Sequence, residues 1–64
     1  MPHRILAWVM PCPSCIEAHF VSAATPERVP AIARFNNVFA AREWVEEQAV
    51  QLNAAVEWVE PPRQ

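Results

Sequence analysis

The sequence predicts a small α+β domain in which one amphipathic helix covers a sheet of three or four mainly antiparallel strands. Three observations support this prediction: short apolar segments bounded by prolines, one long segment with helical periodicity, and a length of 64 residues. A chain of this length forms one domain, here residues 1–64, and buries only about 60% of the surface that its unfolded form exposes. The expected order of elements along the chain is β-β-β-α-β. The helix is expected to pack on the sheet as a second layer, because this buries the apolar faces of both.

The first predicted strand covers residues 4–10, an apolar run rich in β-branched and aromatic side chains. Pro11 is expected to end it. Prolines at positions 11 and 13 disfavour helix around Cys12, since the residue before a proline is driven towards extended or turn geometry.

Residues 16–24 are compatible with two structures. Ile16, Phe20 and Ala24 recur every four residues, which suits a helix, whereas the alternation around Phe20 favours a strand. The next segments decide between them. Residues 25–28 predict a proline turn, and residues 29–35 alternate again and contain a proline that would break a helix. We therefore prefer a hairpin, with strands at 16–24 and 29–35.

The amphipathic helix is predicted at about residues 37–52. Asn36 or Asn37 is expected to cap its start, and Asn53 is expected to end it in the left-handed conformation that glycine usually supplies. A last strand is predicted at residues 54–60. The apolar helical face expected to contact the sheet comprises Val38, Ala41, Val45, Ala49 and Leu52, with Trp44 beside it.

Composition favours a folded chain and excludes several classes of function. Hydrophobic residues make up 53% of the chain, and the net charge is only −2. The absence of Gly, Lys and Asp argues against phosphate-binding loops, Schiff-base chemistry and paired aspartates. Scattered Arg against more numerous Glu gives no basic surface for nucleic acid. The sequence therefore does not point to an enzyme or to a nucleic-acid-binding protein.

A cytoplasmic protein is expected. No apolar run approaches the ~20 residues that span a membrane. The apolar stretch at residues 5–10 is also shorter than the core of a signal peptide. Cysteines in the cytoplasm are normally kept reduced.

The Cys-Pro-Ser-Cys segment, residues 12–15, is the one motif with chemical potential, and three interpretations stay open. In the first, Cys12 and Cys15 are small residues of a proline-shaped turn. In the second, the segment resembles half of a zinc ribbon, in which a hairpin tip supplies two thiolates. His19 is the candidate third ligand; it would be a neighbour of Cys15 on a helix but about 13 Å away on a strand.

In the third interpretation, the motif carries thiol chemistry. A strand followed by Cys-Pro-Ser-Cys at the start of a helix resembles the active-site segment of glutaredoxins and thioredoxins. Residues 29–30, Val-Pro, resemble the cis-proline segment that faces the thiols in that family. The resemblance implies that Cys12 is the attacking thiolate and that Cys15 is the resolving thiol.

The aromatic residues give the leading functional hypothesis. Three tryptophans are a high load for this length, and one helix cannot cover both sheet faces. Trp8 or Trp58 would then form an apolar patch of the kind that marks an interaction site. We therefore expect a non-catalytic module that binds another protein or a second copy of itself and needs no cofactor. The alternative is a zinc-binding or thiol-redox protein that uses Cys12 and Cys15.

Overall fold

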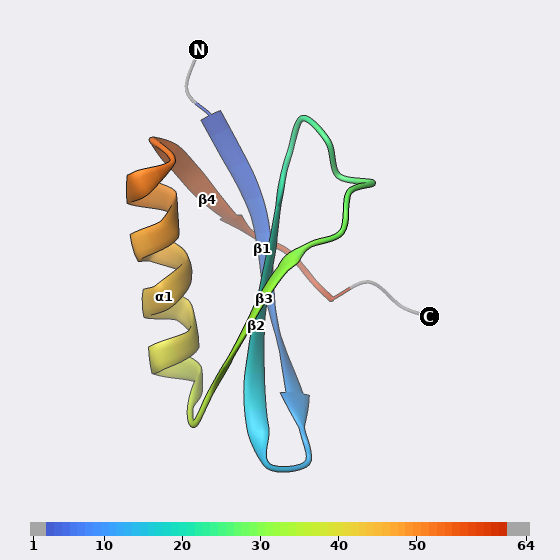
Figure 1. Ribbon diagram of the computed structural model, residues 1–64, viewed down its shortest axis with the longest axis vertical. Helices are drawn as coiled ribbons and strands as arrows, with labels where there is room; N and C mark the ends of the chain where they lie inside the picture. Colours follow the sequence, from blue (N-terminus) through green and yellow to red (C-terminus); the bar gives the residue numbers. More distant parts are fainter. Residues whose placement is uncertain (1–2, 62–64) are drawn as a thin grey trace.

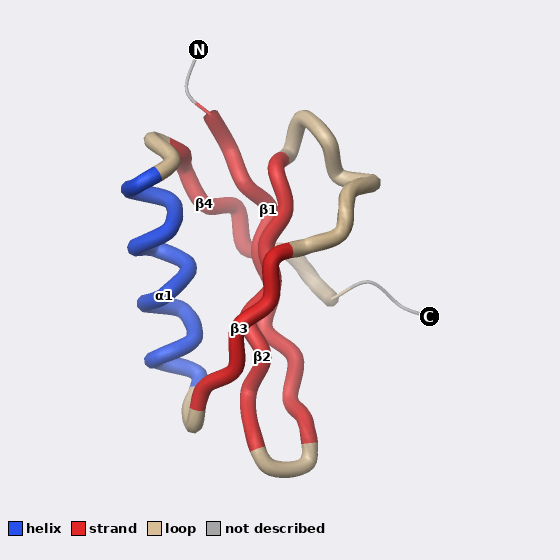
Figure 2. The backbone as a smooth tube through the Cα atoms, in the orientation of Figure 1, coloured by secondary structure: helices blue, strands red, loops and turns tan. Residues whose placement is uncertain are grey.

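The computed structural model describes residues 3–61 and contains four strands and one helix, in the predicted order (Figure 1). Figure 2 shows the strands packed side by side, with the helix on one side of them. A small α+β domain with one helix against a sheet is thereby confirmed. The elements are β1 (His3–Cys12), β2 (Cys15–Ser22), β3 (Ala31–Phe35), α1 (Val38–Gln51) and β4 (Ala54–Trp58).

The four strands form one mixed sheet in the order β3-β2-β1-β4. The pairs β1–β2 and β2–β3 are antiparallel, whereas β1 and β4 are parallel. Two antiparallel pairs are joined by short connections, but β3 and β4 run in the same direction at opposite edges of the sheet. Such strands need a long crossover, and α1 provides it. The helix thus lies across one face because of where β4 has to pair.

The core lies between α1 and this face of the sheet. Ala41, Val45 and Ala49 are buried at a spacing of four residues, as the helical periodicity predicts. They pack against the sheet residues Ile5, Ala7 and Ala18. Several of these side chains are alanine, so helix and sheet approach closely, but little apolar volume is buried.

The apolar helical face predicted from the sequence includes one residue at each end that is not buried in the structure. Val38 and Leu52 are exposed rather than buried. They are the first residue and the C-cap of α1, so they lie beyond the three residues that contact the sheet. Trp44 does lie beside the core, where its ring is 5.4 Å from Phe20 and 5.8 Å from Phe35, measured between ring centroids.

Both ends of the helix are formed as predicted. The Asn37 side chain accepts a hydrogen bond from the backbone N–H of Ala40 at 2.8 Å, which satisfies one of the free donors of the first turn. Asn53 follows the C-cap with φ of 54°, the left-handed conformation that few residues other than glycine adopt readily. These two asparagines therefore delimit the helix in a chain without glycine.

The hairpin predicted over residues 16–35 is confirmed, and residues 16–24 are mainly strand rather than helix. The backbone N–H of Arg28 donates to the carbonyl of Thr25 at 3.1 Å, closing the predicted proline turn. Strand β3 begins two residues later than predicted, after Pro30, which has no N–H to donate to a ladder. At the other edge, β4 ends at Trp58 rather than residue 60.

Strand β1 is longer than predicted, because it continues through Pro11 to Cys12. Its pairing with β4 ends at Ala7, so residues 8–12 have a neighbouring strand only in β2. A proline is tolerated at such a local edge, where its missing N–H leaves no ladder hydrogen bond unmade.

The side of the sheet away from α1 is partly covered as well. Figure 1 shows the 23–30 loop and the chain after β4 on this side. Alternation along β1 and β2 places Trp8, His19 and Val21 here, opposite to Ala7. Each of the three is at most 9% exposed. The second face therefore has its own small buried layer.

The left-handed residue after α1 gives a stability prediction. We expect Asn53→Ala to lower the free energy of unfolding by about 1–2 kcal/mol, because a Cβ without a local hydrogen-bonding group is disfavoured at positive φ. Asn53→Gly should leave it unchanged or raise it. Urea unfolding followed by tryptophan fluorescence measures both. Gln51→Ala, at the exposed end of the same helix, is the matched control, and equal stability of Asn53→Ala and this control would contradict the prediction.

Candidate functional site

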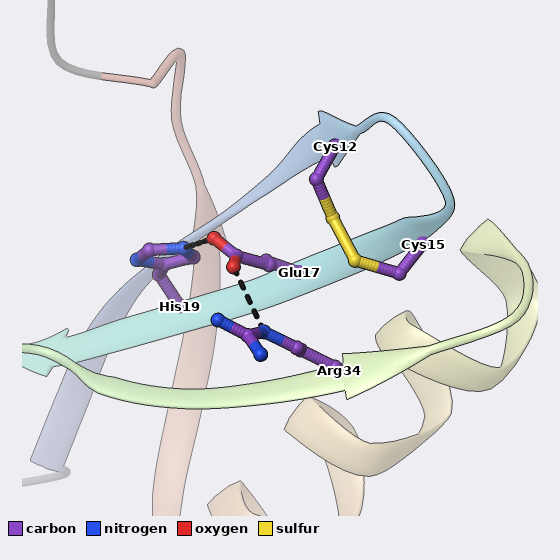
Figure 3. Close-up of polar contacts among 5 residues, drawn as sticks. All are labelled: Cys12, Cys15, Glu17, His19 and Arg34. Atoms are coloured by element: carbon purple, nitrogen blue, oxygen red, sulfur yellow. Dashed lines mark hydrogen bonds and ion pairs between the residues drawn. A yellow bond between two sulfur atoms is a disulfide. The ribbon is translucent and has the colours of Figure 1, made fainter.

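The Cys-Pro-Ser-Cys segment forms the tip of the β1–β2 hairpin. Cys12 and Cys15 are the last register partners of this pair of strands, and two residues, Pro13 and Ser14, turn the chain between them. Proline is favoured at the second position of such a turn because its φ is preset. The two cysteines are joined by a disulfide, with their Cα atoms 5.1 Å apart (Figure 3). The sequence left open whether these cysteines are free, bonded to each other or metal-bound; in the structure, register pairing brings both sulfurs within bonding reach.

Glu17 lies beside the disulfide, a position that was not predicted from the sequence. One carboxylate oxygen of Glu17 and the Sγ atoms of Cys12 and Cys15 all lie within 4.8 Å of one another. Glu17 follows Cys15 by two residues in β2, so both side chains point to the side away from α1. The two-residue spacing of Cys15 and Glu17 is visible in the sequence. It places the two side chains together only if residues 16–24 form a strand.

His19 is the predicted third metal ligand. Among the described residues, however, the group of clustered ligand atoms consists of Cys12, Cys15 and Glu17 and does not include His19. Its Nε2 is 3.1 Å from Oε1 of Glu17, and its ring stacks on Trp8 with centroids 5.5 Å apart. A carboxylate can only accept a hydrogen bond, so the Nε2–H group of His19 is the donor and Glu17 is the acceptor. Figure 3 shows Glu17 between His19 and the cysteines. The strand spacing therefore directs His19 to the carboxylate rather than to the sulfurs.

Arg34 completes the polar cluster from β3. It is the register partner of Glu17, and its Nε donates to Oε2 of Glu17 at 3.1 Å. The hydrogen bond from His19, followed by that from Arg34, holds the pKa of Glu17 below its ordinary value of 4.5, although partial burial opposes this. The Arg34 side chain is largely exposed, so solvent screens its ion pair with Glu17. Glu17 is therefore a carboxylate at neutral pH, with both oxygens engaged.

The two tryptophans predicted to bind a partner lie on opposite faces of the sheet. Trp8 is 7% exposed on the face away from α1, and its indole N–H is buried without a hydrogen-bond partner among the described residues. Trp58 pairs in register with Ala7 and so belongs to the helix-covered face, where the Arg42 guanidinium lies 4.7 Å from the centre of its ring. Trp8 and Trp58 thus lie on opposite faces of the sheet, although both line one open pocket together with Arg42 of α1. Trp8 itself offers little area for contact.

Comparison of the chain with protein-family models, with curated proteins and with solved structures gave no significant match.

Among the described residues, α1 is too short and too polar to cross a membrane.

The hydrogen bonds to Glu17 predict how this carboxyl group titrates. In ¹³C NMR of the oxidised protein, we expect the Glu17 carboxyl carbon to titrate below pH 4.5. His19→Phe should raise this pKa more than Arg34→Gln does, because the bond from His19 is the larger cause and phenylalanine can still stack on Trp8. Arg4→Gln, which removes a cation paired elsewhere with Glu57, should leave it unchanged. A Glu17 pKa at or above the ordinary value would contradict the arrangement.

The same shift sets the sign of a stability change with pH. Because the pKa of Glu17 is lower in the folded than in the unfolded chain, its carboxylate stabilises the fold above about pH 4.5. This contribution is lost as the pH falls through the lower, folded value. Glu17→Gln should therefore be less stable than the parent protein at neutral pH and lose less stability on acidification. Urea unfolding at a series of pH values measures both, and parallel pH profiles would contradict the prediction.

Proposed function

We propose that the protein is a thiol–disulfide redox protein whose working site is the Cys12–Cys15 pair at the hairpin tip. The observation that carries this proposal is the pairing itself: two half-buried cysteines face each other in the last register pair of a hairpin and close to a disulfide. The bond joins residues only three positions apart at the end of the hairpin, so opening it releases a short loop.

The arrangement differs from the one on which the resemblance to glutaredoxins and thioredoxins is based. In the structure the motif leads from strand to strand, so Cys12 does not open a helix. Residues 29–30 lie before β3, and no peptide bond in residues 3–61 is cis. The redox proposal therefore depends on the hairpin geometry of these two cysteines and not on the family.

The reaction requires an external thiol such as glutathione. Its thiolate attacks one sulfur of the disulfide, the S–S bond breaks, and a mixed disulfide forms while the other cysteine leaves as a thiolate. A second external thiol then releases the first, so the pair gains two electrons and two protons and the external thiols become a disulfide. A cytoplasmic location, which we retain as part of this proposal, would supply such a thiol pool.

We expect the fold to persist when this disulfide is reduced. The cross-link closes a loop of only four residues, so the chain-entropy model gives it about 2 kcal/mol, less than a long-range cross-link provides. The two strands are also held by a ladder of register pairs that runs from Ile5↔Ser22 to the tip. Reduction should therefore release the sulfurs and leave the hairpin in place, which is what a reversible site needs.

A redox titration tests this proposal. In glutathione buffers, with thiol trapping and mass spectrometry as the readout, we expect a midpoint between about −270 and −120 mV, the range of redox-active dithiols. The circular dichroism spectrum of the reduced protein should match that of the oxidised protein. Ser14→Ala, within the turn, is the control that should keep the exchange. A midpoint below about −300 mV, or unfolding on reduction, would instead show a structural cross-link.

A second candidate function, a protein-binding module, has a separate observation in its favour. Phe39 and Val50 are 75% and 79% exposed on α1, on the side of the helix opposite to its buried residues. This is not the aromatic sheet face formed by Trp8 or Trp58 that the sequence suggested. We propose a second copy of the chain as the partner, since most soluble oligomers are symmetric homo-oligomers.

Sedimentation velocity tests the self-association. We expect the sedimentation coefficient to rise with protein concentration, and Phe39→Ser with Val50→Ser to abolish the rise. Glutamates 43 and 46 lie beside Phe39 and outnumber the one cation there, Arg42, so added salt should strengthen the association by screening their repulsion. Ile32→Ser, an exposed apolar residue on β3, is the matched control. A chain that stays monomeric at all concentrations would remove this candidate.

A further inference from the structure

A third sulfur atom belongs to the same corner of the sheet as the two cysteines. Met10 precedes Cys12 by two residues in β1, so strand alternation places both side chains on the face away from α1. Cys12 pairs in register with Cys15, and Met10 pairs with Glu17. Once the disulfide is reduced, two thiols and one thioether therefore occupy adjacent positions on one face.

The other donors at this corner are few and are already engaged. Among the described residues, the ligand atoms that cluster with the two sulfurs come from Glu17 alone. The carboxylate of Glu17 accepts hydrogen bonds from His19 and Arg34, one on each oxygen. A structural zinc site needs about four strong ligands, and this corner does not supply them without breaking those bonds.

We propose that the reduced hairpin tip binds one Cu(I) ion through the Sγ atoms of Cys12 and Cys15 and the thioether of Met10. Cu(I) is a soft cation that prefers thiolate and thioether ligands and needs only about two or three of them. Both thiolates are negatively charged and the metal carries one positive charge. Arg34 balances Glu17 beside the site, so the complex adds little repulsion there.

Metal binding at this place is coupled to the redox state of the pair, and in this respect it rests on the function proposed above. Oxidation by a disulfide such as oxidised glutathione takes two electrons from the two thiolates and forms the Cys12–Cys15 bond. The oxidant becomes two thiols, and copper leaves as Cu(I). The hairpin tip is thus a soft-metal site when reduced and a closed disulfide when oxidised.

Competition with the Cu(I) chelator bicinchoninate tests the site. The reduced protein, kept anaerobic, should take one equivalent of Cu(I) from the chelator, and the affinity should fall at least about 100-fold in Cys12→Ser or Cys15→Ser. Met10→Leu should weaken it about tenfold through loss of one ligand. Glu57→Gln, which removes a carboxylate from β4 beside Leu6 and away from the hairpin tip, is the matched control and should stay within about twofold.

X-ray absorption at the copper edge gives an independent readout. We expect about three sulfur neighbours in the parent protein and about two in Met10→Leu, whose similar volume preserves the packing of β1. Unchanged circular dichroism and tryptophan fluorescence confirm that each variant is folded. Oxygen or nitrogen in place of the third sulfur would overturn the assignment to Met10.

Other outcomes also decide against the inference. Copper retained by the double variant Cys12→Ser/Cys15→Ser would show adventitious binding. Zn²⁺ held more tightly than Cu(I), with an affinity that falls in Glu17→Gln and not in Met10→Leu, would assign the corner to zinc. If Cu(I) does not bind but the redox midpoint lies in the expected range, the metal inference fails alone. A structural midpoint would remove the redox proposal whether or not copper binds.

Discussion

The register of the β1–β2 hairpin is the constraint on which the rest of this structure depends. This pairing places Cys12 opposite Cys15, Met10 opposite Glu17 and Trp8 opposite His19. These three pairs occupy every second position along the two strands, so they share one face of the sheet. A slip by one residue would turn every one of these side chains to the opposite face of the sheet. Because β1 also pairs with β4, a slip would displace the parallel edge and the helix that leads to it. The pairing that positions the candidate site is therefore the same pairing that holds the sheet together.

The two faces of the sheet have different compositions because they have different covers. The face under α1 is built from small and branched apolar residues, which allow a helix to lie close to the strands. The other face carries the polar cluster of Glu17, His19 and Arg34 and is covered only by loop segments. Chemistry is concentrated there because side chains on this face reach solvent without interrupting the core.

Trp8 connects the buried layer of this second face with its polar cluster. Its ring stacks on His19, and His19 in turn donates to Glu17, so a buried aromatic ring orients the polar cluster next to the disulfide. The indole N–H of Trp8 is buried without a partner among residues 3–61. Burial of its large ring contributes to the stability of this face. A residue that the composition suggests as a contact surface thus acts mainly from the inside.

The sequence by itself determined the order of the elements and the identity of each one except residues 16–24. Local signals sufficed there: helical spacing, the proline turn at 25–28, and asparagines at the two ends of α1. Only the tertiary structure decided which face each strand turns to the helix, and so which tryptophan is buried against what. It also decided that Glu17, rather than His19, adjoins the cysteines, because residues 16–24 suit helix and strand locally and only pairing with β1 and β3 selects the strand. The face that a side chain occupies and the residues that lie near it depend on strand register and on the crossover of α1. Both involve segments far apart in the sequence, so no short window of sequence contains this information.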